Sequence, residues 1–249
     1  MRLADNTILV TGGGSGIGRE LAQRLHDLGN YVIVAGRRQD ALDETIAGRN
    51  AMSAVVLDIA DAGAISGFAQ KVLQSHPALN VLINNAGIMR EEDLSGPRDL
   101  TGVEAMIATN LLGPIQLTDA LLAHLAAQPG AAIINVTSGL AFVPMARTAT
   151  YSATKAALHS YTLSLRLKLR DRIEVIELVP PGVQTDLTPG QATRKGFLPL
   201  DVFAGETIAL LQQQPTPPEI LVEAVRRLRH AEANGQFAQM LEMINVPRW

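Results

Sequence analysis

Short apolar runs alternate with longer amphipathic stretches along most of the chain. Six runs rich in β-branched residues predict strands: Thr7–Thr11, Tyr31–Ala35, Ser53–Leu57, Val81–Asn84, Ile133–Thr137 and Ile173–Val179. Continuous apolar runs of this length indicate strands that are covered on both faces, as in a parallel sheet. Between them lie the predicted helices Gly16–Leu28, Gln39–Ala47, Ala62–Gln74, Val103–Ala126 and Thr150–Arg170. The alternation predicts right-handed βαβ units and one α/β domain over residues 1–249, with a doubly wound parallel sheet inside three αβα layers.

The pattern loosens after Pro180. The segment Asp186–Pro199 is rich in Thr, Pro, Gly and Gln, which predicts a mobile loop beside the substrate. Leu200–Gln214 reads as a helix, and Glu219–Glu223 is read as a short strand rather than a helix start. A last helix is expected around Phe237–Ile244. We therefore expect residues 200–249 to serve substrate binding or assembly.

Composition narrows the class of protein. The 249 residues carry a net charge of −3 and contain no cysteine, which excludes disulfides, zinc–thiolate sites and a catalytic thiol. The charge predicts no broad surface for nucleic acid or membrane lipid. The start lacks the apolar segment of a signal peptide, and the uncharged stretch 120–146 is broken by polar residues, so we expect a soluble cytoplasmic protein. The five histidines show no metal-ligand spacing, so we expect packing or surface histidines and no metal site.

The first predicted strand runs into a glycine-rich turn that opens a helix, in the sequence Thr11-Gly-Gly-Gly-Ser-Gly-Ile-Gly18. Free backbone N–H groups and the helix dipole favour an anion at such a helix start, and glycine allows a pyrophosphate to approach closely. The candidate cofactor residues here are Gly12, Gly14, Ser15, Gly16, Ile17 and Gly18. A glycine-rich turn without special purpose is the alternative interpretation.

The end of the second predicted strand bears on the choice of dinucleotide. An acidic residue at this place binds the ribose hydroxyls of NAD, whereas a basic one accommodates the extra phosphate of NADP. Here the chain reads Gly36-Arg37-Arg38 with no carboxylate. Arg37 and Arg38 therefore predict NADP(H) rather than NAD(H), with solvated surface arginines as the alternative.

Three residues carry the candidate chemistry. Tyr151 and Lys155 lie four apart in a predicted helix and so share one face. The pKa of a free tyrosine is about 10, and a neighbouring ammonium is expected to lower it, which would make the phenol a better acid and base. Alone this pair is weak evidence for catalysis, because many tyrosine–lysine pairs with this spacing lie on helix surfaces. Ser138 ends the fifth predicted strand, where the carboxyl ends of parallel strands line a ligand crevice and a hydroxyl can bind a carbonyl oxygen.

Asn110 adds a fourth candidate. Pro114 cannot donate to the carbonyl of Asn110, so the helix should kink there and leave that carbonyl free for an ordered water. Such a water beside Lys155 could carry a proton between Tyr151 and solvent. A packing kink without function is the alternative.

Taken together, these motifs resemble the short-chain dehydrogenase/reductase family in its compact single-domain form. The matching residues, in the family's order, are Thr11–Gly18, Asn84–Gly87, Asn110, Ser138, Tyr151 and Lys155, and they cover about the first 185 residues. The resemblance implies a Rossmann fold with strand order 3-2-1-4-5-6-7 and hydride transfer between a carbonyl and a secondary alcohol.

The resemblance also implies roles for single residues. Tyr151 would be the acid/base, Ser138 would orient the substrate, and Lys155 would also hold the nicotinamide ribose. Further cofactor contacts would come from Asp58 to the adenine, from Thr185 to the nicotinamide, and from Asn85, Ala86 and Gly87 beside the central strand. Family members pair the helices of Asn110 and Tyr151 between subunits, which implies a homodimer or homotetramer.

Two departures from the family pattern affect the C-terminal part. The family's P-G-x-V-x-T reads Pro180-Pro-Gly-Val-Gln-Thr185 here, and the glycine-rich C-terminal strand ending is replaced by Glu219–Glu223 and a helical tail. Leu140 and Phe142–Met145 are expected to wall an apolar substrate pocket. The rival functions are a non-catalytic NADP(H) redox sensor, which usually lacks the tyrosine or lysine, and a nucleotide-sugar epimerase, which needs a larger C-terminal domain.

Overall fold

Seven parallel strands form one twisted sheet in the order β3-β2-β1-β4-β5-β6-β7, and the computed structural model describes residues 1–246 of the chain. The strands are Thr7–Thr11 (β1), Tyr31–Gly36 (β2), Met52–Val56 (β3), Leu79–Asn84 (β4), Ala132–Val136 (β5), Glu174–Leu178 (β6) and Glu219–Ile220 (β7). The strand order reverses between β1 and β4, where doubly wound sheets form their ligand crevice. The predicted fold class and strand order are confirmed.

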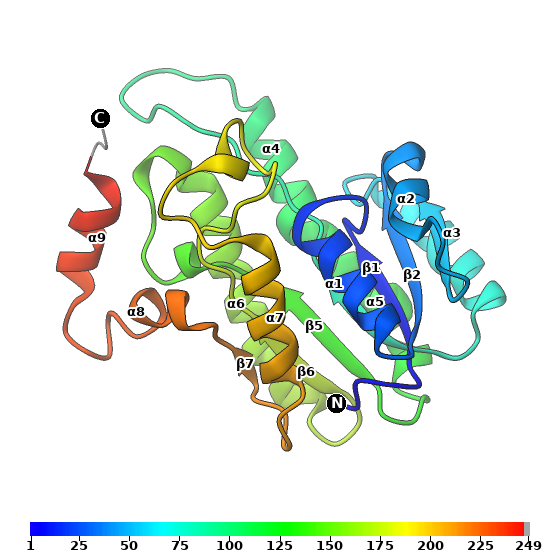
Figure 1. Ribbon diagram of the computed structural model, residues 1–249. Coiled ribbons are helices and arrows are strands. Elements are labelled where there is room, and N and C mark those ends of the chain that lie inside the picture. Colours follow the sequence, from blue (N-terminus) through cyan, green and yellow to red (C-terminus); the bar gives the residue numbers. More distant parts are fainter. Residues whose placement is uncertain (247–249) are drawn as a thin grey trace.

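Helices cover both faces of the sheet, as Figure 1 shows. They are Gly16–Asp27 (α1), Gln39–Ile46 (α2), Ala62–Ser75 (α3), Thr101–Ile107 (α4), Gly113–Leu125 (α5), Ala149–Leu169 (α6), Leu200–Leu211 (α7), Arg226–Arg229 (α8) and Phe237–Asn245 (α9). One core layer packs α1, α2 and α7 against the sheet, and the other packs α3, α5 and α6 against the opposite face. The inner strands are almost wholly buried, which is the physical reason for their unbroken apolar sequence.

The predicted helix Val103–Ala126 is interrupted. A π-helical turn, Ala108–Leu112, separates α4 from α5, and the N–H of Gly113 donates to the carbonyl of Ala108. Pro114 has no N–H to offer the Asn110 carbonyl, which explains why the regular hydrogen bonding fails at this turn. The irregularity expected from Pro114 is therefore present, and it takes the form of a π-turn.

The segment Asp186–Pro199 folds back on the end of β6. Gln191 donates from Nε2 to the Val183 carbonyl at 2.8 Å and to Thr185 Oγ1 at 3.1 Å. Val183 also pairs with Leu198 in a parallel bridge. No pattern in the sequence indicates that this glutamine is buried, and it anchors the segment in the described conformation. The mobility of the segment stays a prediction.

The C-terminal part is less regular than the first half. The predicted strand Glu219–Glu223 shortens to the two residues of β7, and a single turn, Glu223–Val225, leads into α8. Figure 1 shows α8 and α9 beyond the edge of the sheet. Met240 of α9 packs on Val143 and Ala231 in a small cluster of its own. Among residues 1–246, no helix is long and apolar enough to cross a membrane.

Candidate active site

A cavity of about 400 Å³ opens at the point where the strand order reverses. It is lined by the cradle residues Gly12, Gly14, Ser15, Gly16, Ile17 and Gly18, by Arg37, Arg38, Asp58, Asn85, Ala86, Gly87 and Thr185, and by Ser138, Tyr151 and Lys155. The structure thus brings the predicted cofactor residues and three of the four predicted catalytic residues to one cavity. Asn110 is fully buried behind it.

The glycine cradle has the form that a dinucleotide phosphate requires. Gly12 and Gly16 adopt φ angles of +66° and +51°, which favour glycine. A Cβ on Gly18 would lie 2.3 Å from the Gly12 carbonyl oxygen, so no larger residue fits this turn. Ser15, the residue before α1, makes no side-chain capping bond, and the N–H groups at the start of α1 remain available to an anion. The residues present therefore fit a bound dinucleotide.

Two arginines stand at the open end of the cavity. Arg37 and Arg38 are exposed and line it just after β2. Within residues 1–246 neither forms an ion pair or a side-chain hydrogen bond, unlike Arg19, which binds the Gly14 carbonyl and Glu44. Asp58 also lines the cavity, and its Oδ1 accepts from the Ala60 N–H at 3.0 Å. The guanidinium groups are therefore available to a phosphate.

Thr11 and Asn85 join the ends of β1 and β4. Thr11 Oγ1 accepts from the N–H groups of Asn85 and Ala86 at 3.0 and 3.1 Å, and Asn85 Nδ2 donates to the Thr11 carbonyl at 2.9 Å. These bonds fix the backbone of the cavity floor at the centre of the sheet. They join the ends of the two central strands beside the glycine cradle.

Tyr151, Ser138 and Lys155 meet at the inner end of the cavity. Helix α6 presents Tyr151 and Lys155 one turn apart, with Lys155 Nζ 5.6 Å from the Tyr151 ring centroid. Ser138 Oγ accepts from the Leu140 N–H at 3.1 Å, and the Ser138 hydroxyl lies near enough to Tyr151 to influence the pKa of the phenol. Tyr151 is 7% and Lys155 3% exposed. The three polar side chains are thus largely shielded from solvent, and all three line the same cavity.

Burial sets the ionisation of both helix residues. Desolvation raises the pKa of Tyr151 to about 12, and the neighbouring Ser138 hydroxyl only partly opposes this rise. Desolvation lowers the pKa of Lys155 to about 8. The sequence predicted a lowered pKa for Tyr151, so in this structure the direction is wrong. The reason is that the ammonium lies over the Tyr151 ring and donates to the Val136 carbonyl at 2.8 Å rather than to the phenolic oxygen, so burial of the phenolate dominates.

Asn110 acts on the neighbouring backbone through its side chain. Its Oδ1 accepts from the Ile88 N–H at 2.8 Å, and its Nδ2 donates to the Ile88 carbonyl at 2.9 Å and to Thr154 Oγ1 at 3.2 Å. A Cβ built on Gly87 would lie 3.4 Å from Asn110 Oδ1 and 3.6 Å from Lys155 Nζ. Asn110 therefore fixes the segment after β4 against α6, a contact that the sequence did not reveal.

The predicted apolar wall is wrong. Neither Leu140 nor any residue of Phe142–Met145 lines the cavity. Phe142 instead packs against His159 and Arg229, and Val143 is buried against the C-terminal helices. The catalytic end is bordered by Ile88 and Thr109, which no pattern in the sequence indicated, by Pro180 and Pro181 of the Pro180–Thr185 motif, and by Leu187 and Gln191 of the segment predicted to lie beside the substrate.

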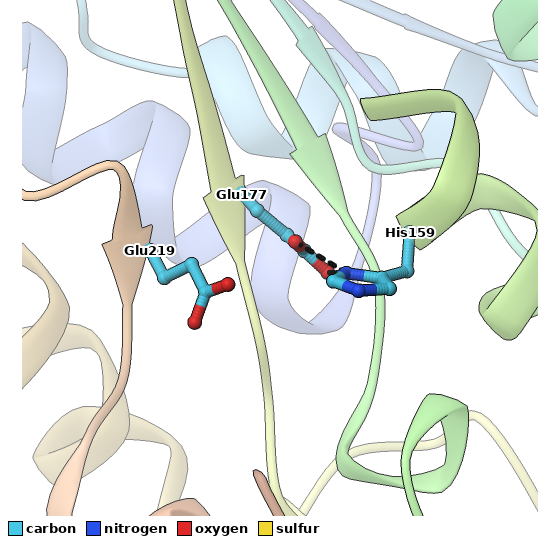
Figure 2. A group of neighbouring side chains, drawn as sticks. All are labelled: His159, Glu177 and Glu219. Carbon is cyan, nitrogen blue, oxygen red and sulfur yellow. Dashed lines mark hydrogen bonds and ion pairs between the residues drawn. The ribbon is translucent and has the colours of Figure 1, made fainter. Parts of the chain in front are cut away.

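A second polar cluster joins α6 to β6 and to the edge strand β7 (Figure 2). His159, Glu177 and Glu219 place one ligand-type atom each within 4.8 Å of one another. Glu177 is wholly buried in β6, and its carboxylate accepts from His159 Nδ1 at 2.8 Å and from Thr137 Oγ1 at 2.7 Å. Glu219 binds Arg229 through both oxygens at 2.8 Å. Protein donors already occupy these carboxylates, so the cluster reads as an ion-pair network.

Comparison with known proteins agrees with this geometry. The family model described as short chain dehydrogenase matches residues 6–195. An uncharacterized oxidoreductase, DltE, of Bacillus subtilis strain 168 is 39% identical over 99% of both chains. A short-chain dehydrogenase structure from Streptomyces avermitilis has a TM-score of 0.82 and 25% identity over 97% of both chains. A structure from Escherichia coli CFT073, described as a short chain dehydrogenase complexed with NADPH, has a TM-score of 0.71 and 25% identity, covering 76% of this chain and 81% of that one.

Proposed function

The chain belongs to the short-chain dehydrogenase family and is an oxidoreductase of that family, and from this premise we propose that it interconverts a carbonyl and a secondary alcohol with NADP(H). One observation carries the proposal. A buried phenol, a strand-end hydroxyl and a buried ammonium meet in the same cavity as a glycine cradle at the start of a helix. A cavity of this kind is suited to bind a dinucleotide and a carbonyl together.

The protein's own groups handle the proton and the developing charge. When bound, NADPH supplies the hydride that reduces the carbonyl carbon. Ser138 donates a hydrogen bond to the carbonyl oxygen through the hydroxyl that otherwise faces Tyr151, while its Oγ accepts from the Leu140 N–H. Tyr151 gives its phenolic proton to the same oxygen. The raised pKa of Tyr151 keeps the phenol protonated at neutral pH, which is the form that reduction needs.

Lys155 and Asn110 support this proton transfer. The ammonium stabilises the phenolate that remains after the proton leaves, and it would hold the ribose hydroxyls of the cofactor beside Gly87. Asn110 holds Ile88 and Thr154 together, so the helix with Tyr151 and the strand end with Gly87 keep their spacing. Because the Asn110 carbonyl lies in the π-turn opposite Pro114, it is the acceptor for a water that returns the proton from solvent.

The test of the reaction is NADPH oxidation by the purified chain against a panel of ketones and aldehydes. We expect Tyr151→Phe to lose turnover by about 10³-fold, because general acid catalysis contributes about 10²–10⁴-fold, while NADPH binding stays within about twofold. Tyr161→Phe, on the same helix but away from the cavity, is the matched control. The rival function of a redox sensor would be supported if the chain binds NADPH, turns over no carbonyl, and binds NADPH equally well as Tyr151→Phe.

Preference for NADP(H) over NAD(H) is supported by the unpaired guanidinium groups of Arg37 and Arg38 and by the NADPH in the E. coli relative. The Arg37→Asp variant should bind NADPH at least about 30-fold more weakly, because it replaces a charge-assisted phosphate contact by repulsion. Binding of NADH should change little or improve. Measured dissociation constants for both cofactors decide this, and an Arg37→Asp variant that keeps its preference for NADPH would refute the assignment.

We also propose a homodimer or homotetramer built on the helices of Asn110 and Tyr151. Large apolar side chains are exposed along these helices: Ile107, Leu112, Leu163 and Leu167. Leu167, at 66% exposure, is the most solvent-exposed of them. Sedimentation should show an oligomer that Leu163→Glu/Leu167→Glu dissociates, and a monomeric wild-type chain would exclude this arrangement. The cytoplasmic location stays a prediction.

A further inference from the structure

Helix α6 carries Tyr151 and Lys155 but does not cap its own start. Thr148, the residue before its first turn, makes no side-chain capping bond, and the first turn holds no acidic residue. The first N–H groups of a helix have no partner within the helix, so a helix without a cap tends to fray there. Tyr151 lies in this first turn, so its position depends on what holds the turn.

Glu92 supplies the missing cap from another part of the chain. Its Oε2 accepts from the Thr150 N–H at 2.7 Å, and its Oε1 accepts from Thr150 Oγ1 at 2.7 Å. The N–H of Glu92 donates to the Arg147 carbonyl at 2.8 Å. The side chain of Glu92 therefore binds the first turn of α6 at Thr150, and its backbone binds the residue Arg147 just before the helix, so both contacts lie close to Tyr151.

The capping carboxylate is built into the fold. The Glu92 side chain is 6% exposed, and Arg98 of the same loop pairs with it from outside. The hydrogen bonds from Thr150 and the charge of Arg98 lower the pKa of Glu92 against its desolvation, so the carboxylate stays ionised at neutral pH. A negative charge at a helix start also interacts favourably with the helix dipole.

The loop that contains Glu92 begins in the active site. It leaves β4 through Gly87 and Ile88, which line the cavity, and Asn110 ties Ile88 to Thr154 of α6. The loop is thus joined to α6 at two places about one helical turn apart, at Thr154 through Asn110 and at Thr150 through Glu92. Two attachments fix both the rotation and the axial position of a helix, whereas one leaves it free to pivot.

We propose that Glu92 is a positioning residue: its carboxylate caps α6 across the fold and holds the phenol of Tyr151 in register with the cavity wall formed by Gly87 and Ile88. This inference rests on the proposed function only where it concerns turnover. The capping contact itself belongs to the fold and is measurable without substrate.

Hydrogen exchange on the full chain tests the cap. Glu92→Ala should raise amide exchange at Thr150–Ser152 by about fivefold, because loss of a cap costs about 1 kcal/mol of local stability. Glu92→Gln keeps a carbonyl oxygen that can accept from the Thr150 N–H, so it should restore most of the protection. Glu91→Ala is the matched control, because the Glu91 side chain is largely exposed and its one ion-pair partner among the described residues is Arg147, at 3.6 Å.

Kinetics then separate positioning from general stability. Glu92→Ala should lower kcat by about tenfold through misplacement of the phenol, with the KM and the NADPH dissociation constant within about twofold of wild type. Glu92→Gln should recover most of the kcat, and Glu91→Ala should equal wild type. Unchanged exchange and kcat in Glu92→Ala, or exchange raised equally over the whole sheet without recovery in Glu92→Gln, would overturn the proposal. A wild-type chain without turnover would refute the proposed function, while the exchange pattern would still decide the cap.

Discussion

Helix α6 contributes to two buried polar groups, and only one of them contains a pair of opposite charges. Tyr151 and Lys155 face the cavity, and within residues 1–246 the Lys155 ammonium has a backbone carbonyl as its partner but no carboxylate. His159, one turn further along, binds the carboxylate of Glu177, which also accepts from Thr137. Lys155 and Glu177 are both buried, yet within residues 1–246 only Glu177 has an oppositely charged side chain as its partner.

The difference distinguishes the proposed ligand site from a side-chain network that joins elements of the fold. A buried charge without a counter-charge is unfavourable, and the pKa of Lys155 falls to about 8 as a result. Such a group is kept where function requires it, and perturbed pKa values gather at active sites. The paired His159–Glu177 group instead joins α6 to β6, while Glu219 and Arg229 extend the network to β7 and α8.

The largest expected effect comes from removing the unpaired cation. Lys155→Met should lower kcat by about 10³-fold, because the phenolate of Tyr151 loses its stabilising charge. The free energy of unfolding should change by less than about 1 kcal/mol, since the lost hydrogen bond to Val136 is offset by relief of a desolvated charge. Turnover assays and urea denaturation of the same preparation measure both. A large loss of stability with turnover retained would reverse the roles that we assign to the two groups.

Removing one member of the His159–Glu177 pair should lower stability and leave turnover nearly unchanged. His159→Leu should lower the free energy of unfolding by about 3 kcal/mol, because it leaves the Glu177 carboxylate buried without its partner. Turnover should stay within about threefold of wild type. The double variant His159→Leu/Glu177→Leu, measured by urea denaturation, should be more stable than His159→Leu, since no unpaired charge remains. Additive losses in the double variant would show that packing rather than charge dominates.

The smallest expected effect is a pH dependence of the free energy of unfolding, which tests whether the Lys155 ammonium is desolvated. The pKa of Lys155 is lower in the folded chain, about 8, than in the unfolded chain, where it has its ordinary value of 10.5. Between these values the unfolded chain binds more protons, so stability increases with pH in this window. From pH 8 to pH 10, wild type should gain about 2 kcal/mol relative to Lys155→Met. Denaturation midpoints across this range measure the gain, and a constant difference would exclude a desolvated Lys155.

The same lysine should shape the activity profile. As pH rises through about 8, the free enzyme loses the ammonium of Lys155, so kcat/KM for carbonyl reduction should fall on this limb. A shallow profile without this limb in wild type would indicate that the ammonium does not support the phenolate. Lys155→Met should lack the limb in either case.

Local sequence signals account for the sheet and the cavity. β1 spans Thr7–Thr11 as predicted, and the glycine turn that follows it lines the cavity as expected. Buried strands and tight glycine turns depend on neighbours in the sequence, so their patterns are readable there. The interruption at Pro114 was foreseen for the same reason, because a missing N–H acts only four residues away.

Contacts between distant segments were not readable. Glu92 caps Thr150, and His159 meets Glu177 and Glu219, through the packing of separate elements that no spacing in the sequence reveals. The wall predicted at Phe142–Met145 failed because the C-terminal helices, whose placement the sequence left open, cover that segment. The direction of the Tyr151 pKa failed because it depends on burial and on where the lysine points.

The π-turn at Ala108–Leu112 changes how this chain can tolerate insertions and deletions. The turn accommodates one residue more than an α-helical turn, and each residue rotates a helix by about 100°. α4 and the turn contact α6, whereas α5 contacts α3 and β4. Loss of any single residue here would restore a regular helix but swing one half away from its partners. Codon deletions should therefore be far less tolerated at this turn than in the loop 93–99, although both lie between the same two strands.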